Sequence, residues 1–325
     1  MASKRRWGWL WLVVFGSVAW AQTGAYPSKP IRILVTTPAG SGADFFARTL
    51  AQGLSDTYKG VAPLVENRPG AGGIIGAREV ANAAPDGYTM TLVTNSNIVQ
   101  RFIQKDIGYD PLNDFSHVTQ LTLGGSVMVV PADSPIKSYE ELVAAAKAAP
   151  GKFNYGTGGN GTPSHMAAAT LGAVFGLDMI HVPFKNSADV VPAILRGDLQ
   201  FSFQVQSFAM PFVRSGKLRV LAITTGKRFS GMPEIPTMLE LTKNELLVQE
   251  TWAGVSMAPK TPPAIVRRLH SEYFKVMQDP TVLKGIAAGG SNPNPSESPE
   301  AYLTFFSKEY EKLREVVRLS GVKAD

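Results

Sequence analysis

The chain has 325 residues, of which 44% are hydrophobic and 18% charged, and its formal net charge at pH 7 is +6. This length suffices for two domains, and the absence of cysteine excludes disulfides, thiolate metal sites and a lipid-attachment cysteine. The Lys and Arg residues are scattered rather than gathered in a stripe with aromatic residues, so no nucleic-acid partner is expected.

Residues 1–21 have the pattern of a secretory signal peptide. A basic start with Lys4, Arg5 and Arg6 precedes an apolar stretch over 7–18 and the small-residue sequence Ala19-Trp20-Ala21. The apolar stretch is shorter than the ~20 residues that a membrane-spanning helix needs, so cleavage after Ala21 is favoured over a membrane anchor. Three of the six net positive charges lie in this leader. We therefore expect an exported protein.

Strands and helices alternate through the first two thirds of the mature chain. A β-branched run at 31–35 is followed by a glycine-rich loop, after which Phe46, Leu50 and Leu54 recur at helical spacing. Further strand-like runs occur at 89–94, 127–130, 154–156, 180–184, 199–203 and 219–223, with helical patterns at 139–148, 164–175, 188–196 and 208–215. This alternation predicts an α/β fold with mixed, mostly parallel sheets flanked by helices.

The composition changes after Thr225. Several prolines surround a strand-like run at 252–257, and helical patterns follow at 263–277 and 299–319. The last pattern carries an apolar stripe, which we interpret as a packing face: Tyr302, Phe305, Phe306, Tyr310 and Leu313. Two lobes are therefore predicted, one from residues 22–100 and 228–325 and one from residues 101–227, with crossovers near 98–103 and 224–230.

The first candidate anion site is the loop Pro38-Ala39-Gly40-Ser41-Gly42-Ala43-Asp44. It lies between a strand and a helix, where unpaired backbone N–H groups and the positive end of the helix dipole attract an anion. Its small residues would let a ligand reach the backbone, and Asp44 is placed to cap the helix. A tight turn with a cap and no ligand is the alternative reading.

The second candidate is the loop Gly156-Thr157-Gly158-Gly159-Asn160-Gly161, which matches the dinucleotide pattern Gly-x-Gly-x-x-Gly. The ribose-binding acid of that pattern should close the following strand, but Asp178 precedes the strand at 180–184, so a dinucleotide is not expected. Thr162, Ser164 and His165 follow the loop, where they could cap the helix or touch a bound carboxylate.

The sequence offers little for catalysis or for a metal. Ser164 and His165 are adjacent, which generally points their side chains in different directions, and no Gly-x-Ser-x-Gly elbow occurs. His117, His181 and His270 are isolated along the chain and are interpreted as structural or surface residues. We expect neither an enzyme, nor a cofactor, nor a metal.

From Tyr26 to Lys323 the sequence resembles the Bug family, the substrate-binding proteins of tripartite tricarboxylate transporters. Eight motifs match in order: Tyr26-Pro27-x-Lys29-Pro30, Glu66-Asn67-Arg68-Pro69-Gly70-Ala71-Gly72-Gly73, Ala84-Pro85-Asp86-Gly87-Tyr88-Thr89, Tyr109-Asp110-Pro111-Leu112-x-Asp114-Phe115, Gly161-Thr162-x-Ser164-His165, His181-Val182-Pro183-Phe184-Lys185, Ser215-Gly216-Lys217-Leu218-Arg219 and Pro236-Thr237-Met238-x-Glu240. Each motif alone is weak, but the ordered set is specific.

The resemblance implies a two-lobed periplasmic-binding-protein fold of type II (Venus flytrap), whose lobes close on a ligand and deliver it to the permease subunits of a tripartite transporter. A monomer located in the periplasm is expected. Carried over by position, the ligand contacts are Ala39, Ser41, Gly42, Ala43 and Asp44 in the first loop and Thr157, Asn160, Gly161, Thr162 and Ser164 in the second. Ser96, at a strand end, and Gln204, after Phe203, are further candidates.

Departures from the family pattern narrow the ligand. Ser41 and Ala43 stand where the family usually has Gly and Thr, and Gln204 stands where amino-acid-binding members have an aspartate. A neutral amide cannot pair with a ligand ammonium, so a small organic carboxylate, either a di- or tricarboxylate or an aromatic acid, is expected rather than an amino acid. The alternatives are a ligand-sensing subunit of a receptor and a periplasmic hydrolase using Ser164 and His165.

Phenylalanines cluster next to Asp44 and Gln204. Their helix and strand spacing indicates that most belong to the core, although one or two could line the cleft and stack on an aromatic acid: Phe45, Phe46, Phe201, Phe203 and Phe208.

Overall fold

The computed structural model of the chain describes residues 26–37, 39, 42–58, 61–185, 187–229, 232–288 and 291–323. The predicted signal peptide and the candidate residue Ser41 lie outside these ranges. Among the described helices, none combines the length and the apolar character that crossing a membrane requires.

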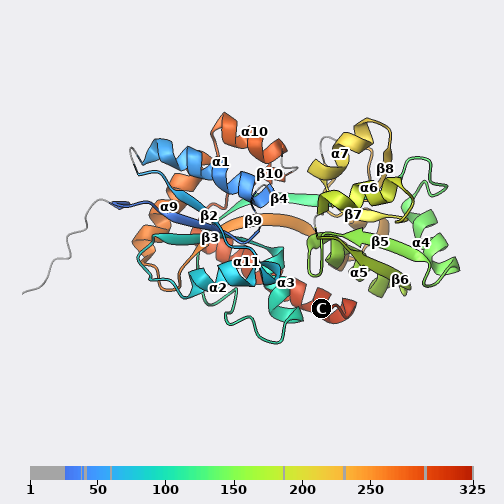
Figure 1. Ribbon diagram of the computed structural model, residues 1–325, viewed down its shortest axis with the longest axis horizontal. Helices are drawn as coiled ribbons and strands as arrows, with labels where there is room; N and C mark the ends of the chain where they lie inside the picture. Colours follow the sequence, from blue (N-terminus) through green and yellow to red (C-terminus); the bar gives the residue numbers. More distant parts are fainter. Residues whose placement is uncertain are drawn as a thin grey trace, which may run out of the picture.

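The described chain alternates between strands and helices (Figure 1). The strands are β1 (Arg32–Val35), β2 (Leu64–Asn67), β3 (Thr89–Thr94), β4 (Ser116–Pro131), β5 (Phe153–Thr157), β6 (Met179–Pro183), β7 (Ser202–Val205), β8 (Leu218–Ile223), β9 (Glu250–Met257) and β10 (Ser291–Pro293). The helices are α1 (Gly42–Thr57), α2 (Ile74–Ala81), α3 (Asn95–Ile103), α4 (Tyr139–Ala148), α5 (Pro163–Phe175), α6 (Val190–Leu195), α7 (Gln206–Arg214), α8 (Met238–Thr242), α9 (Pro263–Val276), α10 (Pro280–Ala288) and α11 (Pro299–Ser320).

The long strand β4 belongs to two sheet regions. Its first part pairs with β9 and β10 in a sheet of order β10-β4-β9-β3-β1-β2, and its second part pairs with β7 and β8. β5 and β6 form a separate parallel pair. The predicted α/β class with mixed sheets flanked by helices is confirmed. Parallel pairing does not predominate, however, because β4 and β9 run antiparallel to their neighbours.

Figure 1 shows two groups of elements, joined by β4 and β9. Elements from both chain ends form the first group, and its core includes Leu54 and Tyr273. Elements from the middle of the chain form the second group, and its core includes Phe201 and Phe203. Burial of these apolar side chains is the main force that holds each group together.

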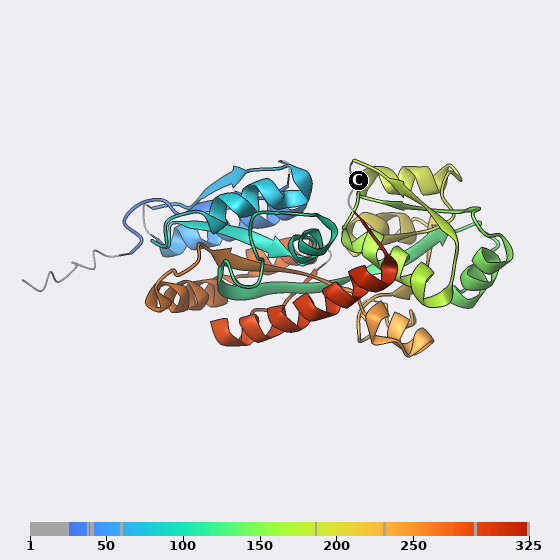
Figure 2. The same cartoon turned by 90° about the horizontal axis from the view of Figure 1, so that it is seen from below.

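The C-terminal helix α11 lies along both groups (Figure 2). It packs against α3 of the first group and α5 of the second. Ser298 caps its N-terminus, and the helix ends at Ser320. The next residue, Gly321, has a φ of 66°, the left-handed conformation that glycine often adopts directly after a helix. The predicted apolar stripe is confirmed as a packing face, because Tyr302, Phe306 and Leu313 are buried together with Met166 of α5.

Candidate functional site

Parallel strands bring three chain segments to one edge of the first group. β1 pairs in parallel with β2 and β3, so the loop after β1, the loop after β2 and the start of α3 meet where these strands end. In Figure 1 the strands run toward the second group. Ala39, Gly42, Ala43 and Asp44 follow β1, and Ser96 lies in the first turn of α3, directly after β3.

Asp44 is held inside the protein at the start of α1. Its side chain is only 6% exposed, and its Oδ1 atom lies 2.9 Å from Nη2 of Arg48 and accepts a hydrogen bond of 3.0 Å from Nδ2 of Asn67. A carboxylate in the first turn also interacts favourably with the helix dipole. The ion pair with Arg48 offsets the negative charge of Asp44, which would otherwise repel an anion at this helix end.

Asn67, the last residue of β2, joins these groups to the first loop. Its Nδ2 atom donates to the carbonyl oxygen of Thr37 at 3.1 Å as well as to Asp44, and its Oδ1 atom accepts from Arg48 at 3.1 Å. Asn67 was not among the residues expected in the site. The sequence feature that could have indicated its role was its position in the family motif that begins at Glu66.

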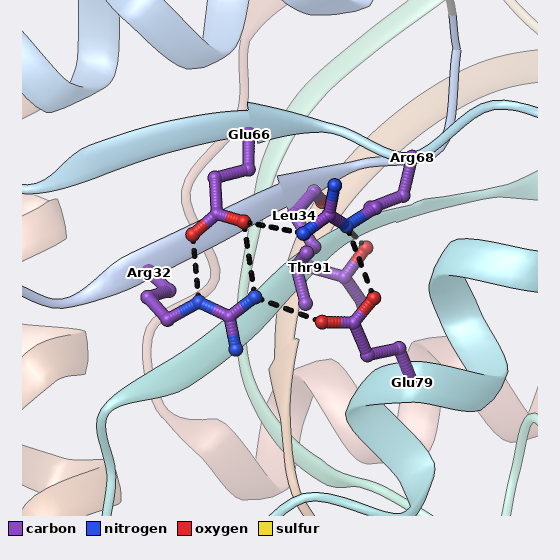
Figure 3. Close-up of polar contacts among 6 residues, drawn as sticks. All are labelled: Arg32, Leu34, Glu66, Arg68, Glu79 and Thr91. Atoms are coloured by element: carbon purple, nitrogen blue, oxygen red, sulfur yellow. Dashed lines mark hydrogen bonds and ion pairs between the residues drawn. The ribbon is translucent and has the colours of Figure 1, made fainter.

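Four charged side chains form a network that links β1, β2 and α2 (Figure 3). Arg32 donates to Glu66 at 2.7 and 3.0 Å and to Glu79 at 2.8 Å, while Arg68 donates to the same two carboxylates at 3.0 and 3.2 Å. The hydrogen bond and charge of Arg32 lower the pKa of the Glu66 carboxyl. The network joins β1, β2 and α2. It thereby supports the register that places Asn67, the residue between Glu66 and Arg68, beside the first loop.

The start of α3 is fixed from both sides. The backbone N–H of Thr94 donates to Oδ1 of Asn97 at 2.9 Å, as part of a capping box. Asn95 donates to the carbonyl of Glu250 at 2.9 Å and accepts from the backbone N–H of Trp252 at 3.1 Å. These bonds hold the turn that carries Ser96 against β9.

The second loop connects β5 to α5 and folds on itself through hydroxyl groups. Thr162 caps α5 by accepting from the backbone N–H of His165 at 3.4 Å, and it donates to the carbonyl of Gly159 at 2.7 Å. The hydroxyls of Thr162 and Ser164 lie 3.1 Å apart. Thr157 is fully buried and accepts from the backbone N–H of Gly159 at 3.2 Å. The helix N-terminus is thus surrounded by neutral hydrogen-bonding groups.

Gly161 lies where this loop meets the first group. Its φ of +73° is in the left-handed region, and a Cβ atom there would come within 3.0–3.1 Å of side-chain atoms of Gln100, Ile103 and Val99 on α3. The position therefore requires glycine both for its backbone conformation and for space. Its backbone N–H donates to Nδ1 of His165 at 3.2 Å.

The geometry is unfavourable for the hydrolase alternative. The Ser164 hydroxyl lies against Thr162, and Nδ1 of His165 is occupied by the backbone N–H of Gly161. A catalytic base must instead face the nucleophile that it deprotonates. In the described part of the chain, no group of three His, Asp or Glu side chains is arranged to hold a metal ion.

The structure places Gln204 beneath the second loop. It is 2% exposed, and its Nε2 atom donates to the hydroxyl of Ser202 at 2.7 Å. Ser202 in turn donates to the carbonyl of Gly156 at 2.6 Å, at the end of β5. Gln204 is therefore linked to the loop through Ser202.

The nearby phenylalanines divide into two kinds. Phe201 and Phe203 are buried in the core of the second group and Phe46 packs against the core of the first, as predicted. Phe45, in the first turn of α1, is 55% exposed. Phe208, on α7, is partly exposed. Phe45 and Phe208 are thus the members of this set with side-chain surface left outside the core.

The histidines are not all isolated in space. His165 on α5 and His181 on β6 stack with ring centroids 3.9 Å apart and an interplanar angle of 10°. His117 is buried beside Ser256 and the carbonyl of Leu112, and burial lowers its pKa to about 4. The stacked pair was not predicted, because its members lie on different elements.

Comparison with known proteins identifies the family. The family described as the tripartite tricarboxylate transporter family receptor matches residues 46–322. The chain belongs to this receptor family. The receptor is also 31% identical to Protein BugT of Bordetella pertussis, over 97% of this chain and 96% of that protein. The resemblance to the Bug family is thereby confirmed, and with it a class of periplasmic, solute-binding receptors.

Solved structures confirm the fold of this receptor. One described as a periplasmic transporter has 32% identity and a TM-score of 0.80, covering 93% of this chain and all of its own. Rpa4515 of R. palustris, solved with adipate, has 25% identity and a TM-score of 0.80, covering 92% of this chain and 99% of its own.

Proposed function

We propose that this receptor captures a small organic carboxylate in the periplasm and delivers it to the permease subunits of a tripartite transporter. The observation that carries the proposal is the second loop, where hydroxyl and amide groups surround the N-terminus of α5. A helix N-terminus with such donors favours an anion without needing a cationic side chain. The adipate bound by the R. palustris relative belongs to this ligand class.

We propose that the ligand lies between the two groups of elements, which act as lobes. The first loop and Ser96 would contribute from one lobe, and Asn160, Thr162 and Ser164 from the other. Thr157 and Gly161, whose hydroxyl and N–H lie against His181 and His165, would instead shape the backbone of the second loop around the ligand. Closure of hinged lobes around a ligand is a common mode of capture in two-lobed binding proteins. The close approach of Gly161 to α3 supports this placement, because the second loop already borders the first lobe.

The lobe boundaries that we propose differ from those expected from the sequence. Ile107 and Phe115 pack with Leu34 in the first lobe, whereas Met238 and Leu247 pack in the core of the second. We therefore place one crossover inside β4 and the other between residues 247 and 250.

We propose further that the receptor has no catalytic activity and is exported by a signal peptide cleaved after Ala21. Mass spectrometry of the protein from a periplasmic extract should give a chain that begins at Gln22. An uncleaved N-terminus would contradict this processing.

Isothermal titration calorimetry of the mature receptor tests the ligand class. The protein should first be unfolded, dialysed and refolded to remove any ligand, then titrated with adipate, malate, citrate, phthalate, benzoate and glutamate. We expect at least one of the non-amino acids to bind and to raise the melting temperature, because a ligand that binds only the folded state stabilises it. Failure of all these acids to bind would overturn the proposal.

A further inference from the structure

Two histidines form a stacked pair behind the second loop. The imidazoles of His165 and His181 lie parallel at 3.9 Å, and the ring of Tyr155 on β5 continues the stack at 5.2 Å from His181. His165 is 5% exposed. Because the three rings come from α5, β6 and β5, the stack ties together the elements that border the loop.

Each histidine holds one end of the loop. The Nε2 atom of His181 lies 2.6 Å from the hydroxyl oxygen of Thr157, where the loop begins. The Nδ1 atom of His165 accepts from the backbone N–H of Gly161 at 3.2 Å, where the loop ends. The segment from Thr157 to Gly161 is thus attached at both ends to the same stack of rings.

The bond to Gly161 requires a neutral imidazole. An Nδ1 atom accepts a hydrogen bond only when it carries no proton, so the proton of His165 must be on Nε2. Burial, together with the neighbouring His181, lowers the pKa of His165 to about 3. The ring therefore stays neutral near neutral pH, and it adds no positive charge to the N-terminal turn of α5, where a cation would oppose the helix dipole.

We propose that His165 and His181 are positioning residues for the carboxylate site, which hold the second loop in its binding conformation without contacting the ligand. The inference rests on the proposed function, because it concerns the same site. By taking up the N–H of Gly161, His165 fixes which donors of the loop remain for an anion. Recognition is then left to the remaining amides and hydroxyls of the loop.

A pair of substitutions of similar size tests the role of the acceptor atom. His165→Asn keeps an oxygen near the position of Nδ1 and loses the ring, whereas His165→Leu loses both the ring and the acceptor. Hydrogen exchange of the Gly161 amide, followed by NMR in the ligand-free protein, should accelerate about tenfold in His165→Leu and stay within about threefold of the wild type in His165→Asn.

Adipate affinity, measured by calorimetry, should follow the same order. We expect adipate affinity to fall about tenfold in His165→Leu, the size of effect that the loss of one hydrogen bond produces. The loss of affinity in His165→Asn should be smaller. His181→Phe keeps an aromatic ring but removes the bond to Thr157, so it should also weaken adipate binding. Melting temperatures would show whether any of these variants fails to fold. If His165→Leu does not fold, His165→Asn is compared with the wild type instead.

The possible outcomes are distinct. Equal adipate affinity and equal Gly161 exchange in the Leu and Asn variants would overturn the positioning role, because the ring would then act only by packing. A loss of affinity without any change at Gly161 would overturn it as well. A wild-type protein that protects Gly161 from exchange but binds none of the tested acids would overturn the proposed function, while the hydrogen bond itself would still be observed.

Discussion

The side-chain amide of Asn67 donates a hydrogen bond of 3.0 Å to the buried carboxylate of Asp44. The same nitrogen donates to the carbonyl of Thr37, so one side chain holds both the first loop and the first turn of α1. This relationship makes Asp44 an anchor for the loop. Its carboxylate is committed to Asn67 and Arg48, which suits a site that must accept an anion.

Replacing Asn67 should therefore affect both stability and binding. Asn67→Ala leaves the Asp44 carboxylate and the Thr37 carbonyl without this donor, and we expect a loss of about 1–3 kcal/mol in the free energy of unfolding. Carboxylate affinity should fall, because the loop loses its support. Urea denaturation and calorimetry measure the two effects. Asn82→Ala, at an exposed residue after α2, is the control, and an Asn67→Ala variant no weaker in binding than this control would contradict the prediction.

Removing the charge of Glu66 should give a pH-dependent loss of stability. A carboxyl whose pKa is lower in the folded than in the unfolded chain stabilises the fold above the unfolded value of about 4.3, and this contribution disappears as the pH falls through the folded value. Because Arg32 lowers the pKa of Glu66, we expect Glu66→Gln to be about 1 kcal/mol less stable than the wild type at pH 7. The difference should shrink below about pH 4.

Urea denaturation of both proteins from pH 3 to pH 8 tests this, with Glu297→Gln at an exposed site as the control. A stability difference that stays constant over the whole range would show that the carboxylate charge is not responsible. High salt should also reduce the difference at pH 7, because these side chains are partly exposed to solvent.

Gly161→Ala should reduce stability and carboxylate affinity more than a Gly→Ala substitution at another position with a similar left-handed backbone conformation. Gly197 provides the matched control, since its φ is +83° and a methyl group added there would meet no heavy atom within 4 Å. An L-residue in this conformation costs about 1–2 kcal/mol at either position. Only Gly161→Ala would also press against α3, so it should lose more stability and should weaken carboxylate binding. Equal melting temperatures and equal affinities in the two variants would contradict this prediction.

Ser164→Ala distinguishes a binding contact from a catalytic residue. We expect carboxylate affinity to fall about fivefold to tenfold with little change in melting temperature, as for the loss of one hydrogen bond to a charged ligand. Ser215→Ala, at an exposed residue after α7, should leave the affinity unchanged. Incubation with a p-nitrophenyl ester should give no hydrolysis above background for either protein. Hydrolysis that disappears in Ser164→Ala would instead favour the enzyme alternative.

Local patterns in the sequence were sufficient for many individual elements. The predicted helix at 139–148 coincides with α4, because Ser138 caps it and its apolar residues recur at helical spacing. The predicted strand at 89–94 coincides with β3. For β4, only residues 127–130 were predicted, because its first part contains Gly124, Gly125 and polar residues that interrupt a strand pattern. The helices α2, α3, α8 and α10 and the strands β2 and β10 were not predicted.

The sequence by itself determined the α/β class, the two glycine-rich loops and, through its ordered motifs, the family. These properties depend on local propensity and on residues that are close along the chain. Only the tertiary structure decided that β4 and β9 pair antiparallel, that Asn67 reaches Asp44 and that His165 stacks on His181. Those contacts join residues from different elements, and they form only when the strands align and the helices pack, so no local pattern specifies them.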